Sequence, residues 1–154
     1  MNLVIDYLKN HSEHVPLLAS WIFDTWGHLY YSSLEEAQAD LKMHLKTVSL
    51  PLTYIALIDD IPVGTCSLMI NDGIRPDLVP WLGSLFVEPN MRGRGVGEQL
   101  IHAVTEKAHN LGYRRLYLLA FDETLPSWYA KLGWRMVGMD ELNGHAVSVM
   151  ELKL

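Results

Sequence analysis

The segment from Leu85 to Gly97 constrains the fold of this chain more than any other. An apolar run that ends at Val87 leads into a loop with glycines at positions 93, 95 and 97, and a helical pattern follows directly. Glycine lacks a Cβ atom, so the backbone there can curl and approach a ligand closely. Free N–H groups at the helix start converge, and the helix dipole adds positive potential. The segment therefore predicts a strand, a loop and a helix that bind a phosphate or pyrophosphate.

Two arginines, Arg92 and Arg94, alternate with these glycines and supply positive charge for the same anion. A P-loop would need Gly-x-x-x-x-Gly-Lys followed by Ser or Thr, and the segment has no such lysine. A Rossmann fingerprint would need Gly-x-Gly-x-x-Gly, whereas these glycines fall at every second position. The remaining alternative is a glycine-rich turn without a ligand, which would leave the two arginines unexplained.

The spacing of hydrophobic residues predicts the other elements. We expect strands over 2–8, 53–59, 62–70, 79–87, 115–121, 134–139 and 145–152, and helices over about 13–27, 34–48, 96–110 and 125–132. Ser33 and Glu36 have the spacing of a capping box, which predicts where the second helix begins. This order predicts a mixed α/β sheet with helices packed on it. A length of 154 residues with 49% hydrophobic residues fits a single domain over 1–154.

Composition excludes several classes of function. The net charge of -6 argues against non-specific nucleic-acid binding and favours a neutral or cationic substrate. Cys66 is the single cysteine, so an internal disulfide is excluded and a core position is expected. The histidines and this cysteine form no set with zinc-ligand spacing, so we predict no metal. No apolar run approaches the ~20 residues of a membrane span and no signal peptide is recognisable, so we expect a cytoplasmic protein without membrane contact.

The sequence Arg92-Gly93-Arg94-Gly95-Val96-Gly97 resembles the (Gln/Arg)-x-x-Gly-x-(Gly/Ala) signature of the GNAT N-acetyltransferases. The segment 128–134, Trp-Tyr-Ala-Lys-Leu-Gly-Trp, is similar to a second motif of that family, and the intervening residues can hold one helix and one strand. The resemblance implies a mixed, mostly antiparallel sheet flanked by helices, with a splayed central strand pair. It also implies acetyl transfer from acetyl-coenzyme A to a primary amine of a small molecule, peptide or protein.

The resemblance assigns roles to the residues that match the motifs. The Leu85 amide would polarise the thioester carbonyl, Val87 would pair with the pantetheine amide, and the glycine-rich loop would wrap the pyrophosphate. Asp122 stands where many members carry an asparagine that touches the cofactor arm. The expected cofactor-binding residues are Leu85, Phe86, Val87, Arg92, Gly93, Arg94, Gly95, Val96, Gly97 and Asp122.

Amine acetylation needs a deprotonated amine, hydrogen-bond donors for the oxyanion and a proton for the departing thiolate. Tyr129 matches the tyrosine of the family and is the expected proton donor, because a phenol with a pKa of ~10 is protonated at neutral pH. Some members carry a catalytic glutamate where this chain has Trp81. The base must therefore be a water chain or another side chain, with Asp77, Glu88 and His28 as candidates.

Aromatic residues between the first two helices predict the acceptor site. In the family this region commonly forms one wall of that site, so we expect Trp26, Tyr30 and Tyr31 there, with Trp81 lining the same cleft. Such a wall suits an apolar or cationic amine, although the same rings could simply bury the helices on the sheet. Members of the family are often dimers, so a homodimer is one expectation. The alternative function is a non-catalytic module that binds acyl-coenzyme A and regulates a partner.

Overall fold

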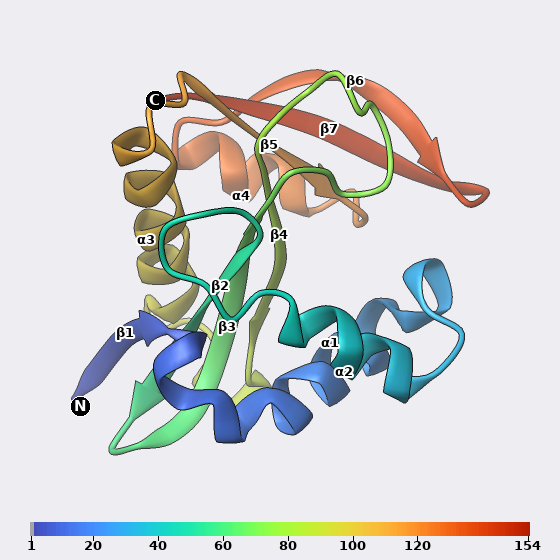
Figure 1. The fold of residues 1–154 in the computed structure, drawn as a ribbon. Helices are drawn as coiled ribbons and strands as arrows, with labels where there is room; N and C mark the ends of the chain where they lie inside the picture. Colours follow the sequence, from blue (N-terminus) through green and yellow to red (C-terminus); the bar gives the residue numbers. More distant parts are fainter. Residues whose placement is uncertain (1) are drawn as a thin grey trace.

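The computed structural model, which describes residues 2–154, has seven strands in one sheet, in the order β1-β2-β3-β4-β5-β7-β6 (Figure 1). The strands are β1 (Leu3–Tyr7), β2 (Leu52–Ile58), β3 (Ile61–Met69), β4 (Trp81–Val87), β5 (Arg115–Ala120), β6 (Arg135–Leu142) and β7 (His145–Lys153). The helices are α1 (Val15–Tyr30), α2 (Leu34–Lys42), α3 (Val96–Asn110) and α4 (Leu125–Lys131), with 3-10 turns η1 (Leu8–His14) and η2 (Pro89–Met91). All neighbouring strands are antiparallel except β4 and β5, so the expected fold is confirmed.

The helices cover both faces of the sheet (Figure 1). Helices α3 and α4 share the largest hydrophobic cluster with β2 to β5, while α1 and α2 pack on the opposite face. The hydrophobic stripe of α3 is the one that the sequence predicts, and its buried members are Val96, Leu100, Ile101, Val104 and Ala108. Cys66 is fully buried in the largest cluster, as expected of a small core residue. Burial of this much apolar surface from both sides fixes the sheet in place.

The parallel pair β4 and β5 meets at one point only. Trp81 and Tyr117 are the sole partners in its register, and the Tyr117 amide donates to the Pro80 carbonyl at 3.1 Å. Beyond this bridge the two strands diverge, so the facing backbone groups of β4 have no strand partner. The predicted splayed pair is therefore confirmed, and the sheet has an opening in its middle.

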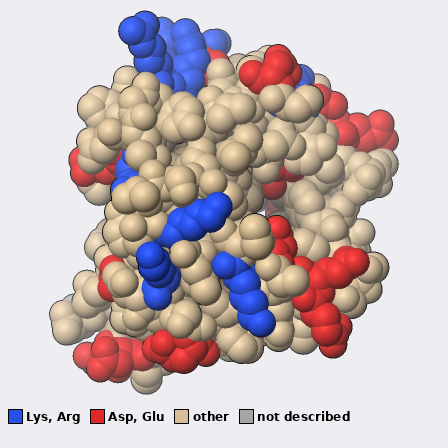
Figure 2. Space-filling model, viewed as in Figure 1, with Lys and Arg blue, Asp and Glu red and all other residues tan. Residues whose placement is uncertain are grey.

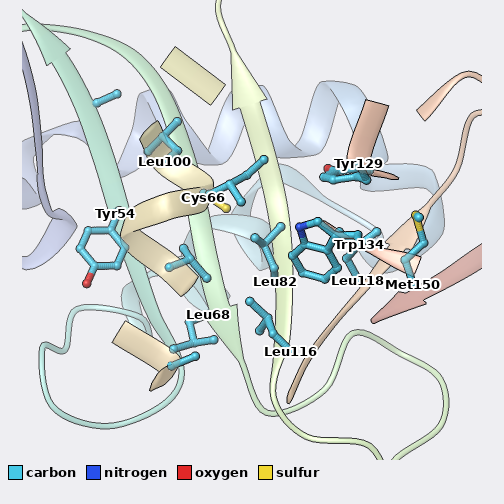
Figure 3. Close-up of a cluster of buried hydrophobic side chains, with 14 of the residues drawn as sticks. Tyr54, Cys66, Leu68, Leu82, Leu100, Leu116, Leu118, Tyr129, Trp134 and Met150 are labelled. Atoms are coloured by element: carbon cyan, nitrogen blue, oxygen red, sulfur yellow. The ribbon is translucent and has the colours of Figure 1, made fainter. Parts of the chain in front are cut away.

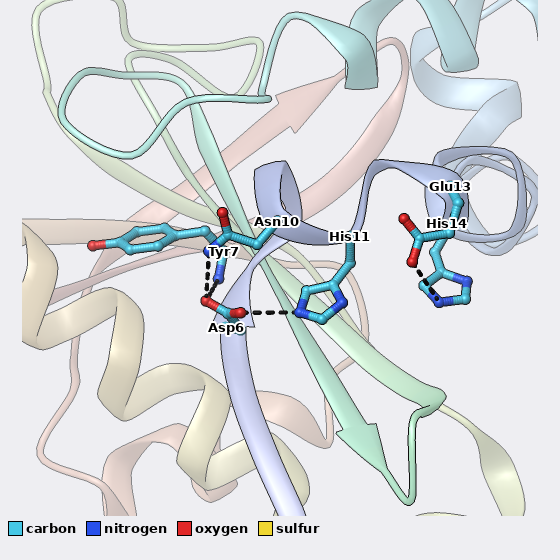
Figure 4. Close-up of polar contacts among 6 residues, drawn as sticks. All are labelled: Asp6, Tyr7, Asn10, His11, Glu13 and His14. Carbon is cyan, nitrogen blue, oxygen red and sulfur yellow. Dashed lines mark hydrogen bonds and ion pairs between the residues drawn. The ribbon is translucent and has the colours of Figure 1, made fainter.

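Asp6, near the end of β1, forms hydrogen bonds with residues of the 3-10 turn η1 that follows (Figure 4). The Asp6 carboxylate at the end of β1 accepts hydrogen bonds from the Tyr7 amide at 2.7 Å and from Asn10 Nδ2 at 3.1 Å. His11 Nε2 lies 2.9 Å from its other oxygen. These bonds lower the pKa of Asp6, although burial works in the opposite direction. The carboxylate thus links the end of β1 to the Asn10 and His11 side chains of η1.

Two predicted helix boundaries need correction. The first helix runs to Tyr30 and is preceded by a separate 3-10 turn, whereas we expected one helix over about 13–27. The second ends at Lys42, and Val48 lies beyond it with 76% of its surface exposed. The end tightens because the His44 amide bonds the Leu41 carbonyl, three residues back. The apolar spacing past this point therefore falls in the connection between α2 and β2.

The capping box of α2 forms in a modified way. The Ser33 hydroxyl accepts from the Glu36 amide at 3.2 Å, as predicted. The Glu36 carboxylate, however, accepts from the amide of Ser32 at 2.8 Å instead of from that of Ser33. Both donors are still satisfied, so the helix begins where the sequence indicates.

Charged side chains of both signs are interspersed on the face seen in Figure 2. Lysines and arginines there form separate small groups, divided by uncharged surface, with acidic groups along the lower edge and the right-hand side. Among residues 2–154, no helix combines the length and the apolar character that crossing a membrane requires.

Candidate active site

A cavity of about 960 Å³ lies where β4 and β5 diverge. Residues of both strands line it, together with the glycine-rich loop and residues of α3 and α4 from one face and of α1 and α2 from the other. The cavity therefore reaches both faces of the sheet through its central opening. Such an opening can admit an extended molecule from one side and a second molecule from the other.

A β-bulge shapes the β4 wall of this cavity. Ser67 pairs with Gly83 and Thr65 pairs with Phe86, so Ser84 and Leu85 both stand opposite one residue of β3. Ser84 adopts the left-handed conformation with a φ of 52°. A bulge of this kind bends the strand and changes the direction of its backbone groups. Leu85 lies just after the bend, on the cavity wall.

The glycine-rich loop closes the same end of the cavity. Gly93 and Gly95 have φ angles of +76° and +84°, which side chains on other residues rarely permit. A Cβ atom at either position would meet no protein atom within 4 Å, so these glycines border open space. Gly95 is also the residue that precedes α3, and the first residues of that helix, whose amides lack helical partners, line the same cavity. The loop can therefore receive an anionic group, as the sequence predicts.

The two arginines of the loop have different positions. Arg92 Nε donates to the Val87 carbonyl at 2.8 Å, and the guanidinium lies 5.6 Å from the centre of the Phe86 ring. Both arginines are exposed, but Arg92 lines the cavity and Arg94 lies outside its lining. The prediction that both arginines serve one anion thus finds geometric support for Arg92 only.

Tyr129 of α4 lines the cavity. Its ring lies in the buried hydrophobic cluster, close to Trp134 (Figure 3). Its ring is 4.9 Å from that of Trp128 and 5.9 Å from that of Trp134, both in edge-on contacts. Only 6% of the residue is exposed, and burial raises the pKa of the phenol above its usual value, with Cys66 adding to the shift. The hydroxyl therefore stays protonated at neutral pH, as a proton donor must.

Asp122 borders the cavity where β5 ends. Its Oδ1 accepts hydrogen bonds from the Thr124 amide at 2.8 Å and from the Thr124 hydroxyl at 2.9 Å. These bonds lower the pKa of the carboxyl group. One oxygen of Asp122 is therefore occupied in shaping the turn that leads to α4.

On the opposite face, Trp26, Tyr30 and Tyr31 line the cavity as expected. The Tyr31 hydroxyl donates to Asp40 Oδ2 at 2.5 Å, and its ring centre lies 6.2 Å from that of Tyr30. Trp81 is fully buried, and its indole N–H donates to the Leu78 carbonyl at 2.6 Å. It packs against Tyr117 beneath the cavity, so the expectation that Trp81 lines the cleft is not met.

The candidate bases lie elsewhere. His28 and Asp77 are exposed and Glu88 borders a different, smaller depression, so none of the three lines the cavity. The carboxylate that lines the cavity beside β4 is Asp72, which no sequence pattern singles out. The Tyr30 hydroxyl donates to Asp72 Oδ1 at 3.1 Å. Burial raises the pKa of Asp72 to about 7, against the lowering effect of this bond.

A separate buried polar row joins β3, β2 and the segment after α2. The Ser67 and Thr53 hydroxyls lie 2.6 Å apart, and Thr53 Oγ1 is 2.9 Å from His44 Nδ1. Burial lowers the pKa of His44, although the nearby Asp40 acts in the opposite direction. Ser67, His44 and Asp40 line the cavity, which gives its α2 side a polar floor that the sequence did not indicate. Within residues 2–154, no three His, Cys, Asp or Glu side chains lie close enough together to hold a metal ion.

A sequence profile that describes the acetyltransferase (GNAT) family matches residues 15–134 of the chain. Both motifs discussed above, at 92–97 and 128–134, fall inside the matched region. No curated protein sequence matches the chain.

Solved structures share the fold. A GCN5-related N-acetyltransferase from Kribbella flavida gives a TM-score of 0.77 over 99% of this chain and 98% of its own, at 17% identity. An aminoglycoside 6'-N-acetyltransferase complexed with coenzyme A gives 0.74 over 97% and 96%, at 18% identity. N-acetylglutamate synthase from Neisseria gonorrhoeae, complexed with coenzyme A and N-acetyl-glutamate, gives 0.74 at 22% identity. That match covers all of this chain but only 35% of the synthase.

Proposed function

Because the chain belongs to the acetyltransferase (GNAT) family, we propose that it transfers an acetyl group from acetyl-coenzyme A to a primary amine of a small molecule or peptide. The observation that carries this proposal is the opening between β4 and β5, which leads directly to the glycine-rich loop. Two of the solved structures that share the fold hold coenzyme A, which supports the choice of donor.

The cavity has the features that the donor would need. The pyrophosphate would lie against Gly93 and Gly95, where a Cβ atom would enter open space, and against the first amides of α3. The pantetheine arm would pair with the free backbone edge of β4 at Leu85 to Val87. Arg92 already holds the Val87 carbonyl, so the Val87 amide and the groups of Leu85 are the better candidates for this pairing.

The reaction would be a direct transfer. The amine attacks the thioester carbonyl, and the negative charge that develops on its oxygen is stabilised by the Leu85 amide. The carbon–sulfur bond then breaks, and the thiolate takes a proton from the Tyr129 hydroxyl. Support for this role comes from the position of Tyr129 on the cavity wall and from the burial that keeps its phenol protonated. Tyr129 regains its proton from the amine nitrogen, which loses one as it becomes an amide.

Thermal unfolding with acetyl-coenzyme A tests the choice of donor, with ATP and NAD as controls. A ligand that binds only the folded state stabilises it by about 2.7 kcal/mol at a hundredfold excess over Kd. We expect stabilisation by acetyl-coenzyme A and none by the controls. Stabilisation by ATP or NAD alone would refute the proposal.

Release of free coenzyme A thiol in the presence of a panel of primary amines then tests catalysis. The panel includes peptides and polyamines. If the protein binds acetyl-coenzyme A but no amine causes thiol release, the alternative function, a non-catalytic module that binds acyl-coenzyme A, would be favoured over the enzyme.

A further inference from the structure

The loop between β3 and β4 places a carboxylate over β4. Asp72 lies above Gly83: a Cβ atom added to Gly83 would come within 3.4 Å of Asp72 Oδ2 and would collide with Met69 Cε. Gly83 is two residues from Leu85, the residue proposed to polarise the thioester. Strand β4 itself carries no acidic side chain. The loop therefore supplies, beside the proposed reaction centre, the type of group that β4 lacks.

This position of Asp72 is held by several contacts. The Asn71 side chain accepts from the Gly73 amide and donates to the Ile74 carbonyl, both at 2.8 Å, which closes the turn around Asp72. Arg75 forms an ion pair with Asp140 of β6 at 2.8 Å, which attaches the loop to the sheet. The Tyr30 hydroxyl of α1 bonds both Asp72 Oδ1 and the Asp72 carbonyl at 3.1 Å. The carboxylate is thus fixed before any ligand arrives.

One oxygen of Asp72 is left for a ligand. Asp72 is half-buried, and its accessible part faces the cavity that it lines. Tyr30 occupies Oδ1, and no hydrogen bond within residues 2–154 occupies Oδ2. The rings of Trp26 and Tyr31 line the same cavity, and aromatic faces attract cations. A negative group with an aromatic wall is the arrangement that binds an organic ammonium ion.

We propose that Asp72 binds the acceptor as an ammonium ion and takes its proton, and that the acceptor is therefore a cationic primary amine. This inference rests on the proposed acetyl transfer and specifies its base and its class of substrate. The proton moves from the ammonium nitrogen to Asp72 Oδ2, which leaves a neutral amine with a free electron pair. After transfer, Asp72 releases this proton to water through the cavity. Tyr30 is a positioning residue that holds the carboxylate.

The environment of Asp72 suits this task. An alkylammonium ion has a pKa of ~10.4 and an ordinary aspartate one of ~3.9, so proton transfer between them is strongly unfavourable. Burial raises the pKa of Asp72 to about 7, which roughly halves the difference. The titratable groups that face it are Tyr30, which is bonded to it, and Tyr31, whose own pKa Asp72 helps to raise; β4 contributes none. Both phenols stay neutral around pH 7, so Asp72 is the group that titrates there.

The test compares Asp72→Asn with Asp60→Asn, a matched charge removal in the exposed β2–β3 turn. The probe is 2-phenylethylamine, and its uncharged counterpart is 2-phenylethanol. Calorimetry on the protein saturated with coenzyme A measures binding of each probe, and thiol release from acetyl-coenzyme A measures transfer to the amine. We expect Asp72→Asn to weaken binding of the amine at least about tenfold and to lower turnover about a hundredfold or more. Binding of the alcohol and of acetyl-coenzyme A should be unchanged, and Asp60→Asn should behave like the parent.

A pH profile separates a base from a merely structural residue. In the parent, kcat/KM for the amine should fall below about pH 7 as Asp72 becomes protonated, and Asp72→Asn should lose this dependence. Equal binding and turnover in Asp72→Asn and the parent would overturn the inference. So would a parent protein that binds acetyl-coenzyme A but neither binds nor acetylates 2-phenylethylamine. Failure of acetyl-coenzyme A to bind at all would instead refute the proposed function.

Discussion

The Tyr30 hydroxyl donates to the Asp72 carboxylate at 3.1 Å, although the two residues are 42 positions apart in the chain. The bond joins the end of α1 to the loop between β3 and β4, so two segments that meet only in the folded chain build this part of the cavity. It also holds an acidic group in a half-buried position at the cavity wall. Burial of a carboxylate costs stability whenever the group is ionised, and this cost can be measured.

Replacement of Asp72 by asparagine should stabilise the protein at neutral and alkaline pH. The pKa of Asp72 is about 7 in the folded state and ~3.9 in the unfolded state, so the folded state binds the proton more tightly. Stability is therefore lost as pH rises from about 4 to 7 in the parent but not in Asp72→Asn. We expect a gain of about 2 kcal/mol in the free energy of unfolding at pH 8, after allowance for access from the cavity. Urea unfolding at pH 5 and pH 8 measures it.

A smaller gain at pH 8 than at pH 5 would contradict this account of Asp72. The exposed variant Asp60→Asn provides the control, and its stability should follow that of the parent at both pH values.

Gly95→Ala should weaken the binding of acetyl-coenzyme A and destabilise the protein. The φ of +84° at Gly95 costs roughly 1–2 kcal/mol for a residue with a Cβ atom, and that atom would project into the space assigned to the pyrophosphate. Gly144→Ala is the matched control, because its φ of +82° imposes a similar backbone cost in the turn between β6 and β7, outside the cavity lining. Unfolding with and without acetyl-coenzyme A compares the two variants; equal behaviour would count against the loop as the pyrophosphate site.

Tyr129→Phe should lower turnover and leave the affinity for acetyl-coenzyme A nearly unchanged. The substitution removes the proposed proton donor but keeps the ring contacts with Trp128 and Trp134. A loss of about a hundredfold in kcat is expected, measured as thiol release with the fastest amine of the panel. Tyr113→Phe, just past the end of α3, should have no such effect. Unchanged turnover in Tyr129→Phe would remove this residue from the mechanism.

His44 should make the protein less stable in mild acid. Burial lowers the pKa of His44 in the folded state below the ~6.5 of the unfolded chain, so the unfolded state binds the proton more tightly. Its stabilising contribution is present above about pH 6.5 and is lost as pH falls toward the folded pKa. His44→Gln should therefore lose less stability than the parent between pH 7.5 and 5.5. His102→Gln, at an exposed position of α3, is the control, and a parent that loses no more than His44→Gln would refute the prediction.

Local patterns predicted the parts of the fold and site that depend on neighbours in the chain. The glycine-rich loop is one case, because the positive φ angles of Gly93 and Gly95 need residues without a Cβ. The buried stripe of α3 is another, since its helical period alone determines which side chains face the sheet. Tyr129 was identified from its motif, and the structure places it on the cavity wall.

Residues that depend on contacts distant in sequence were missed. Asn71-Asp72-Gly73 reads only as a turn, and nothing in it indicates that the loop folds back over β4. In the same way, the pairing of Thr53 with Ser67 across two strands makes a polar row that no local pattern reveals. For Trp81 the sequence predicted a place in the site that the structure does not give it. Trp81 is the bridge partner of Tyr117, and this pairing holds it in the core.

The single bridge between Trp81 and Tyr117 also has a mechanical consequence. Strands β1 to β4 and strands β5 to β7 are two small sheets hinged at one end, and each has its own network of ladder bonds. A cofactor arm bonded to β4 would act as a surrogate strand and would brace the hinge. Amide hydrogens of Leu85 and Val87 should then exchange with solvent slowly only while acetyl-coenzyme A is bound, whereas that of Phe86, opposite Thr65 in the β3 ladder, should exchange slowly in both states. Acetyl-coenzyme A would then link the two halves of the sheet, which in the protein alone share only the Trp81–Tyr117 bridge.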